Sequence, residues 1–342
     1  MKAIFFEKHG GPDVLKFGDL PDPEPAAGEA LIRVRAVALN YLDIWVRKGW
    51  KGLQLEMPHI GGSDVAGEIV SVKAGSGWSE GTKVIVNPGI ITAEDEWTRR
   101  GEDSVSPGYR ILGEHLRGGM AELVVVPISI VFKMPDTRTF EEACAPLLVG
   151  TTCWRMLFKR AKLRAGESVL IVGSGGGVNS LAISFAKAAG ALVYVLAGTD
   201  SKLDKALEIG ADHAVNYNKT TNWPVEILKL TRGRGVDVVI DNVGQKTLEN
   251  SLRAVARGGR IVTVGNTSGY SINFDNRLLF TKQVSLIGST MGSKQDFIDC
   301  MQFMLQHDIK AAIDRVEPLK DGAHMLQRLE EGAHFGKIIL KP

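Results

Sequence analysis

A glycine-rich stretch is the most chemically informative feature of the sequence. It follows the continuous apolar run Ser168–Val172, which is typical of a buried parallel strand, and it precedes a helical pattern. Glycines at such a turn let backbone N–H groups approach a pyrophosphate at the start of the helix. The alternative is a glycine-rich turn that binds no ligand. We predict a dinucleotide site whose turn consists of Gly173, Ser174, Gly175, Gly176, Gly177 and Val178.

The end of the second predicted strand, Leu192–Ala197, indicates which nucleotide is bound. Enzymes that use NAD usually carry an Asp or Glu there, about 20 residues after the glycines. This chain instead has small and hydroxyl-bearing residues and a lysine, which suit a 2′-phosphate and therefore NADP(H): Gly198, Thr199, Ser201 and Lys202. Two alternatives are that Ser201 and Asp204 only form a capping box, with Lys202 exposed, or that Asp200 reaches the ribose.

The later strand ends are predicted to complete this site, because ligands of such folds bind outside the carboxyl ends of the strands. The strands expected here are His213–Tyr217, Val236–Val243 and Arg260–Gly265. The residues that we assign to the cofactor from these ends are Tyr217, Asn242, Val243, Gly265, Asn266 and Thr267.

The elements that must position these residues alternate between strand and helix. With Ser168–Val172, Leu192–Ala197 and Val284–Gly288, six strands are expected, which predicts a doubly wound parallel sheet in an α/β protein. The N-terminal part reads as short strands such as Ala30–Ala38, and the tail returns to mixed structure with a final strand Lys337–Lys341. We expect a discontinuous β-rich domain of residues 1–130 plus 290–342, and a dinucleotide-binding domain of residues 131–289.

Composition excludes several classes of function. Lys and Arg number 41 against 39 Asp and Glu, so no basic excess indicates nucleic acid. No apolar run is long enough for a membrane span, so no membrane association is expected. The three cysteines are widely spaced and form no CxxC pair, which fits a reducing cytoplasm.

Taken together, the chain resembles the medium-chain dehydrogenase/reductase superfamily, and within it the zinc-free quinone oxidoreductases and enone reductases. The resemblance covers nearly all residues, and it implies a GroES-like β-domain, a Rossmann domain and an active site in the cleft between them. Besides the glycine turn, the segments that carry it are His9–Pro12 with Val14-Leu15, Ala38–Asn40 with Asp43, Arg47 and Gly49, Gly62–Gly67, Gly210–Asp212, and Val236–Asp241 with Gly244.

The resemblance also shows where this chain departs from the zinc-dependent members. They carry a Cys where this chain has Asn40 and a His where it has Ser63, and the third ligand position falls near Leu148 or Val149. Zinc needs three N, S or O ligands and an open position, so no catalytic metal is expected. His59 and Asp64 are conceivable replacement ligands, but no third residue completes the set.

A second zinc site of the family is also lost. The stretch Asn87–Gly119 has no clear periodicity and resembles the lobe that binds a structural zinc in relatives. His115, beside this lobe, is expected to be structural rather than a ligand. The four Cys positions of the lobe correspond here to Thr92, Asp95, Thr98 and Ser106.

Chemistry without a metal favours activated substrates. Hydride addition to an enone or quinone spreads charge over an enolate or phenolate, which a few hydrogen-bond donors can stabilise. The candidates are Asn40 and Tyr41 as donors, with Asp43 anchoring their loop, and Thr151 near the nicotinamide or substrate. For Tyr41 the alternative is an apolar wall.

We therefore expect a cytoplasmic NADPH-dependent oxidoreductase that acts on a quinone, an enone or a similar aldehyde or ketone. Two other hypotheses are an alcohol dehydrogenase that keeps zinc through unusual ligands and a protein that binds NADPH without turnover. The resemblance further implies a homodimer or homotetramer that pairs an exposed sheet edge, expected here at Val284–Gly288.

Overall fold

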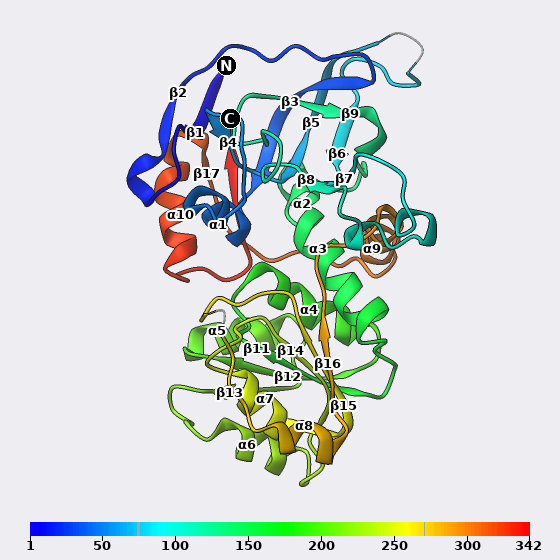
Figure 1. The fold of residues 1–342 in the computed structure, drawn as a ribbon, viewed down its shortest axis with the longest axis vertical. Helices are drawn as coiled ribbons and strands as arrows, with labels where there is room; N and C mark the ends of the chain where they lie inside the picture. The colour runs from blue at the N-terminus through cyan, green and yellow to red at the C-terminus, as the bar shows by residue number, and fades with distance from the viewer. Residues whose placement is uncertain (74–75, 270) are drawn as a thin grey trace. The chain divides into compact units, whose positions relative to one another are not determined.

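The computed structural model describes residues 1–73, 76–269 and 271–342, and its chain divides into two compact units (Figure 1). Unit 1 consists of Met1–Val149, Gly292–Phe297 and Lys310–Pro342. Unit 2 consists of Gly150–Met291 and Ile298–Ile309. The chain therefore returns to unit 1 after its main passage through unit 2.

Unit 1 is built on a seven-stranded sheet in which β3 is central. Its order is β10-β6-β5-β3-β18-β17, and β9 also pairs with β3. A three-stranded sheet, β2-β1-β4, and a hairpin of β7 and β8 accompany it. The strands are β1 Lys2–Phe6, β2 Lys16–Asp19, β3 Glu29–Ala38, β4 His59–Ile60, β5 Asp64–Val72, β6 Lys83–Val86, β7 Gly89–Ile91, β8 Tyr109–Ile111, β9 Leu123–Pro127, β10 Val131–Lys133, β17 Ile313–Pro318 and β18 Lys337–Lys341.

The alternation of β3 explains its central place. Its sequence EALIRVRAVA buries every second residue from Ala30 to Ala36, and its last three residues are all buried. The antiparallel register places Ala38 opposite Asp64 of β5 and opposite Ile339 of β18. The start of β5 and the start of β18 therefore flank the end of β3, and this edge of the sheet carries the polar residues described below.

Helices and turns complete unit 1. Apolar side chains of β1, β3, β5 and β18 form its main core together with Met325, Leu326 and Leu329 of α10. The stretch Asn87–Gly119, predicted only as an aperiodic loop, contains the β7–β8 hairpin and two 3-10 turns, Thr98–Arg100 and Asp103–Val105. The helices are α1 Tyr41–Lys48, α2 Phe140–Cys144 and α10 Gly322–Glu330, with further 3-10 turns at Pro12–Val14, Ile128–Ile130 and Leu319–Asp321.

Unit 2 contains one parallel sheet of six strands in the order β13-β12-β11-β14-β15-β16. This is the strand order of the doubly wound dinucleotide fold, which confirms the predicted fold class. Its central strands are mostly apolar, because helices cover a parallel sheet on both faces. The strands are β11 Ser168–Val172, β12 Leu192–Ala197, β13 His213–Asn216, β14 Val236–Asp241, β15 Val255–Thr263 and β16 Ser285–Gly288.

The helices of unit 2 connect successive strands. Along the chain α4 follows β11 and precedes β12, and α5 follows β12 (Figure 1). The described helices are α4 Gly177–Ala188, α5 Asp200–Glu208, α6 Trp223–Leu230, α7 Leu248–Ala254 and α8 Asn276–Lys282. Two helices are divided between the units, α3 Leu147–Trp154, which a π-helix at Arg155–Arg160 extends, and α9 Lys294–Gln306. None of the described helices is long and apolar enough to cross a membrane.

Candidate active site and nucleotide-binding site

The glycine turn of unit 2 has the form that its sequence predicts. β11 ends at Val172, Gly173 adopts a positive φ of 83°, and α4 starts at Gly177 after Gly176 as N-cap. A Cβ added to Gly176 would meet no atom within 4 Å, so this position is open to a ligand. The first N–H groups of a helix have no partner within the helix. The turn therefore presents backbone donors beside open space.

A buried hydroxyl in this turn lacks a partner. Ser174 Oγ is buried and makes no hydrogen bond within the described part of the chain, whereas the Ser174 backbone N–H donates to Leu196 O at 2.9 Å. An unsatisfied buried hydroxyl carries a desolvation cost that a ligand oxygen would remove. The unpartnered hydroxyl and the open position at Gly176 both fit a bound pyrophosphate. We conclude that the residues of this turn fit the nucleotide that the fold implies.

Two asparagines brace the strand ends around the turn. Asn179 Nδ2 donates to Val172 O at 2.9 Å and to Gly173 O at 2.6 Å. Asn242 Nδ2 donates to Asn179 Oδ1 at 2.8 Å, and Asn242 Oδ1 accepts from Val264 N at 2.9 Å. Asn242, which the sequence assigns to the cofactor, therefore uses its side chain to join the ends of β11, β14 and β15. Sequence reasoning missed Asn179 as a site residue, although it belongs to the same motif.

The other predicted strand-end residues gather beside this brace. Val243 Cγ2 lies 3.6 Å from the position that a Cβ on Gly173 would take. A Cβ on Gly265 would come within 3.1 Å of Asn242 O, so the two strand ends approach closely at a glycine. Asn266 lies against Gly244, and Thr267 is exposed.

Lys202 reaches from α5 to the glycine turn. Its Nζ lies 2.9 Å from the position that a Cβ on Gly175 would occupy. The ammonium is therefore held where the N-terminus of α4 would attract a phosphate. Thr199 and Ser201 lie exposed nearby, with their hydroxyl oxygens 3.4 Å apart. Because α5 begins at Asp200, Ser201 lies inside its first turn, and the Ser201–Asp204 capping box is not formed.

The Asp200 carboxylate is bound within the protein by two side chains. Its carboxylate accepts hydrogen bonds from Asn216 Nδ2, at 2.7 Å, and from Lys219 Nζ. These bonds, first that from Lys219, lower the pKa of Asp200 below its ordinary value. Next to it, the Tyr217 hydroxyl lies 2.9 Å from the position of a Cβ on Gly198. The ring of Tyr217, which follows β13, thus lies close to the end of β12. The Asp200 carboxylate is engaged by Asn216 of β13 and by Lys219 after it.

Unit 1 holds a buried polar cluster at the end of β3, formed by Asn40, Asp64 and Lys337. Lys337 Nζ donates to Asn40 Oδ1 at 2.5 Å and to Asp64 Oδ2 at 3.0 Å. Asn40 Nδ2 donates to Asp64 Oδ2 at 3.0 Å, and Leu148 N donates to Asp64 Oδ1 at 2.7 Å. Asp64 is completely buried and Lys337 is 3% exposed. Each of the strands β5 and β18 contributes one charge, and Asn40 follows β3.

Burial and ion pairing have opposite effects on the Asp64 carboxyl of this cluster. Burial raises the pKa of Asp64 above its ordinary value, while the Lys337 charge and the N–H donors of Asn40 and Leu148 pull it down. Three donors on one carboxylate stabilise the ionised form, so we treat Asp64 and Lys337 as an ion pair. Sequence reasoning missed Lys337, since it reads as the first residue of an ordinary edge strand. The lysine that opens the otherwise apolar segment Ile338–Leu340 was the available signal.

The predicted catalytic residues have different surroundings. Asn40 is buried, and its amide hydrogens reach Asp64 and, at 3.4 Å, Ala38 O. Tyr41 is half-buried and packs edge-on against Trp45, with 5.3 Å between the ring centroids. Thr151 lies fully buried in α3, within unit 2.

Asp43 ties two segments together. Its Oδ2 accepts from Asn40 N at 2.7 Å and its Oδ1 from Gly62 N at 2.9 Å. Burial raises the pKa of Asp43 to about 6, although these two N–H groups and Lys337 counteract the rise. The loop before α1 is thereby fixed to the turn that precedes β5. Ser63, the next residue after Gly62, is fully buried, and its hydroxyl has no partner within the described residues.

The residues at the family's metal positions do not fit zinc. Asn40 and Ser63 offer an amide and a hydroxyl, and Leu148 and Val149 offer no ligand atom. The two conceivable replacements are engaged elsewhere, because His59 Nε2 lies 3.1 Å from Gly113 O and Asp64 is paired with Lys337. Among the described residues, no group of three or more His, Cys, Asp or Glu side chains converges on one point.

The lobe after β7 is organised by a carboxylate at one of the former ligand positions. Asp95 Oδ1 accepts from Trp97 N and Thr98 N, both at 2.9 Å, and Asp95 Oδ2 accepts from Ser106 Oγ at 2.7 Å. These bonds, first that from Ser106, lower the pKa of Asp95. Thr92 Oγ1 donates to Gly108 O at 2.9 Å. Hydrogen bonds of Asp95 and Thr92 therefore join the two ends of this lobe.

His115 has a local role at the edge of this lobe. Its Nδ1 accepts from Ile111 N at 3.1 Å. Its Nε2 lies 3.7 Å from Glu114 Oε1. Burial, aided by Arg110, lowers the pKa of His115, so the imidazole is neutral at pH 7 and this contact is not an ion pair.

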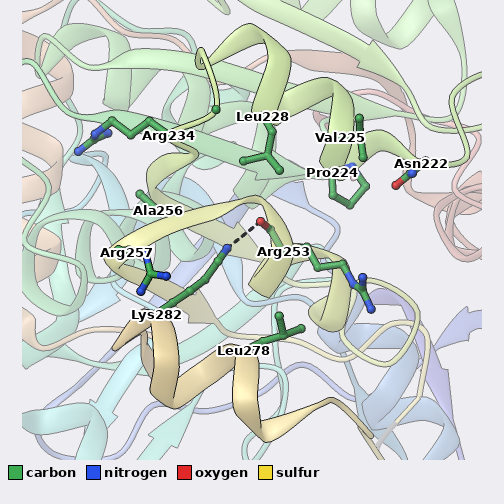
Figure 2. A pocket seen from close by; sticks show the side chains of 11 residues that line it. Asn222, Pro224, Val225, Leu228, Arg234, Arg253, Ala256, Arg257, Leu278 and Lys282 are labelled. Carbon is green, nitrogen blue, oxygen red and sulfur yellow. Dashed lines mark hydrogen bonds between the residues drawn. The ribbon is translucent and has the colours of Figure 1, made fainter.

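A separate pocket of unit 2 does not belong to the nucleotide site. Figure 2 shows it between α6, α7 and α8, near the amino ends of β14 and β15. Two of its cations face carboxylates, Arg234 with Asp237 and Arg253 with Glu249. Lys282 donates to three main-chain carbonyls at 2.8–2.9 Å, those of Leu252, Arg253 and Val255. These cations are engaged within the protein, so the pocket carries no argument for a ligand.

Comparisons with known proteins agree with this fold and site. Residues 26–136 match the family model of the alcohol dehydrogenase GroES-like domain, and residues 177–306 match that of the zinc-binding dehydrogenases. The zinc-type alcohol dehydrogenase-like protein C1773.06c of Schizosaccharomyces pombe is 31% identical over all of this chain and 99% of its own length. A quinone oxidoreductase of Rattus norvegicus is 31% identical over 99% of this chain and 97% of its own length.

A solved structure titled NAD-dependent alcohol dehydrogenase is also similar. It is 40% identical, superposes with a TM-score of 0.96 and covers the whole of both chains. A dinucleotide fold joined to a GroES-like unit defines an oxidoreductase that uses a nicotinamide cofactor. The chain belongs to the medium-chain dehydrogenase/reductase superfamily and is alcohol dehydrogenase-like.

Proposed function

We propose that this protein is an NADPH-dependent reductase of enones or quinones that works without a bound metal ion. The observation that carries the proposal is the buried cluster of unit 1. Where the zinc-dependent relatives carry ligands, this chain has Asn40 and Ser63, and the local positive charge is the Lys337 ammonium. An ammonium that is already bound to an amide and a carboxylate leaves no ligand set for zinc.

The choice of NADPH is supported by charge at the end of β12. A carboxylate facing the ribose would repel a 2′-phosphate, but Asp200 is bound by Asn216 and Lys219. Lys202 brings a positive charge to the glycine turn, and the hydroxyls of Thr199 and Ser201 lie exposed beside it. We assign these three residues to the nucleotide's 2′-phosphate.

The substrate class follows from what the site can stabilise. When bound, NADPH supplies a hydride. Without a Lewis acid, a simple ketone lacks strong polarisation, whereas an enone or quinone delocalises the new charge over several atoms. The hydroxyl of the half-buried Tyr41 is our candidate proton donor. Thr151 is assigned to the nicotinamide or substrate, and Asn40 and Asp43 to holding the loop that carries Tyr41.

A panel of substrates tests this function. Purified protein is given NADPH or NADH with enones, quinones, simple aldehydes and simple ketones, and bound metal is measured on the same sample. We expect oxidation of NADPH by enones or quinones, unaffected by a chelator, with far less than one metal ion per chain. Tight NADPH binding with no turnover of any substrate would instead favour a binding protein.

An NAD-dependent alcohol dehydrogenase is the second candidate, because the solved structure that is 40% identical has that title. This function requires oxidation of alcohols with NAD. If one zinc ion per chain were found and its removal abolished that activity, the second candidate would replace the first.

We also propose that the protein is a cytoplasmic homo-oligomer. The cysteines of the described chain are free and buried, as in a reducing compartment. β16 is an edge strand of its sheet, and Leu286 on this strand and Phe280 before it are 41% and 61% exposed. A second copy of this edge would cover both. The mass in solution, measured by light scattering, tests the oligomeric state.

A further inference from the structure

The turn that follows β13, residues 216–219, folds back onto the end of β12 in unit 2. The Asn216 side chain shapes this turn, because its Oδ1 accepts from Asn218 N at 3.0 Å and from Lys219 N at 3.3 Å. Asn218 Nδ2 in turn donates to Gly198 O at 2.8 Å. This segment, which we call the β13 turn, is therefore held against the first residue after β12 by hydrogen bonds of its own side chains.

The β13 turn fills the space into which an acidic side chain directly after β12 would extend. NAD enzymes usually carry an Asp or Glu near this strand end, where it binds the ribose hydroxyls. A Cβ on Gly198 would come within 2.9 Å of the Tyr217 hydroxyl oxygen and within 3.0 Å of Asn218 Nδ2. An Asp or Glu at this position would therefore have to move these side chains aside. The first carboxylate after β12 is instead that of Asp200, at the start of α5.

Both oxygens of the Asp200 carboxylate are bound by the β13 turn. Asp200 lies in sequence between Thr199 and Ser201, whose exposed hydroxyls we assign to the 2′-phosphate. Its Oδ1 accepts from Asn216 Nδ2 at 2.7 Å, and its Oδ2 accepts from Lys219 Nζ. A carboxylate without these donors would be an acceptor for ribose hydroxyls and would repel a 2′-phosphate. The turn therefore neutralises the one group of this segment that would favour NAD.

Stability of the fold does not account for this arrangement. The side chains of Asp200 and Lys219 are 57% and 67% exposed. An exposed ion pair contributes little to the free energy of unfolding, because water and salt screen it. What the two donors do change is the chemistry beside the nucleotide site. The ammonium balances the charge of the carboxylate, and the amide and the ammonium each occupy one of its oxygens.

We propose that Asn216 and Lys219 determine nucleotide specificity without binding the nucleotide, by withholding the Asp200 carboxylate from the adenosine ribose. This inference rests on the proposed function, which assigns the 2′-phosphate to two hydroxyls and to Lys202 in the same segment. Selection of NADPH then has two parts. The hydroxyls and Lys202 attract the phosphate, and the β13 turn removes the acid that favours NAD. Asp200, once released from the turn, accepts from the ribose hydroxyls of NADH and repels the 2′-phosphate of NADPH.

The test is a mutant cycle built on Asp200. The release variant is Asn216→Ser with Lys219→Met. Its serine hydroxyl can still accept from the N–H groups of the turn, but it lacks the amide that donates to Asp200. Asp200→Asn removes the carboxylate, alone and in combination with the release changes. The matched control is Lys229→Met, which breaks the similarly exposed ion pair with Glu226 on α6 of the same unit.

The assay is calorimetric titration of each protein with NADPH and with NADH, together with its melting temperature. We expect the release variant to bind NADPH about 10-fold more weakly, because the freed carboxylate repels the 2′-phosphate. It should bind NADH about 10-fold more tightly, because a hydrogen bond from a ribose hydroxyl to a carboxylate is charge-assisted. In the presence of Asp200→Asn, the same release changes should alter either affinity by less than about twofold. The control should bind both nucleotides as the wild type does.

The possible results separate this inference from the proposed function. If the wild type binds NADH as tightly as NADPH, the choice of NADPH in the proposed function fails, and the inference fails with it. If the wild type prefers NADPH and the release variant keeps the same ratio of the two dissociation constants, the inference alone is refuted. Equal weakening of both nucleotides also refutes it, since that is the pattern of a merely disturbed turn.

The Asp200→Asn background decides between withholding and direct contact. If the release changes weaken NADPH just as much when Asp200 is replaced, Lys219 binds the phosphate itself and the inference is wrong. If the release variant does not fold, Lys219→Met alone is measured in the same way, since it leaves the Asn216 bonds of the turn in place. It must weaken NADPH relative to NADH, and only where Asp200 is present.

Discussion

Lys202 offers the sharpest test of nucleotide choice. Its ammonium lies at the glycine turn, 2.9 Å from the position of a Cβ on Gly175, while the nearest carboxylate, on Asp200, is bound to Asn216 and Lys219. We assign Lys202 to the 2′-phosphate that distinguishes NADPH from NADH. The variant Lys202→Ala should therefore weaken NADPH binding selectively. Lys205→Ala, an exposed change in the same helix, is the matched control.

The size of the effect follows from the interaction that is lost. A hydrogen bond to a charged group contributes about 1.5–3 kcal/mol. Since about 1.4 kcal/mol corresponds to a tenfold change in the dissociation constant, NADPH should bind roughly 10- to 150-fold more weakly. NADH lacks the 2′-phosphate, so its affinity should change by less than about twofold on the same reasoning.

Calorimetric titration with both nucleotides, at one fixed salt concentration, measures these affinities. Equal weakening of NADPH and NADH would show that Lys202 contacts the pyrophosphate instead, and the specificity argument would fail. No change for either nucleotide would remove Lys202 from the site altogether.

Three further predictions concern other parts of the molecule. Ser174→Ala should raise the unfolding free energy of the nucleotide-free protein by roughly 1 kcal/mol, because it removes a buried hydroxyl without a partner among the described residues. In calorimetry the variant should bind NADPH and NADH more weakly to the same extent, by about 2- to 10-fold. Weaker binding of one nucleotide alone would contradict this. Burial raises the pKa of Glu114 from 4.5 to about 7, because the neutral form is favoured in the folded protein. The protein therefore keeps its full stability below pH 4.5 and loses free energy of unfolding at this residue as the pH rises through 7. Glu114→Gln should therefore stabilise the protein at pH 8 by up to about 3 kcal/mol and hardly at all at pH 4, and chemical denaturation at both pH values that gave equal effects would refute the cause. Asp95→Ala should make the segment from residue 92 to residue 108 several-fold more sensitive to limited proteolysis, whereas a chelator should have no effect. Since hydrogen bonds lower the pKa of Asp95, acid that protonates it should also make this segment of the wild type more sensitive. Protection of the segment by added zinc would contradict the hydrogen-bond account.

Local sequence patterns predicted most of the fold of unit 2. The apolar runs of β11 and β12 and the glycine turn between them are set by neighbouring residues, and their predicted bounds agree with the structure. Short helices such as α1, which begins at Tyr41, were not predicted. Its first turn is fixed by the reciprocal bonds of Asn40 and Asp43, and Asp43 also binds the distant Gly62.

The candidate site was predictable where it depends on one motif and not where it depends on pairing. Asp64 and Lys337 are separated by 273 residues and meet only because β5 and β18 flank β3. The local sequence marks Lys337 only as a lysine before an apolar segment, and it does not identify Asp64 as the partner. For Asn40, the sequence suggested a free hydrogen-bond donor, but the ion pair engages both ends of its carboxamide. Burial and pairing, which arise from the tertiary fold, decide which donors remain available.

The most direct test of the central claim follows the hydride itself. Chelator-treated protein is incubated with an enone and NADPH that carries deuterium at the transferred position, and the product is examined by NMR. We predict deuterium at the β-carbon of the saturated ketone, at the same rate with and without added zinc. Deuterium at the carbonyl carbon, or transfer that starts only when zinc is added, would contradict the account.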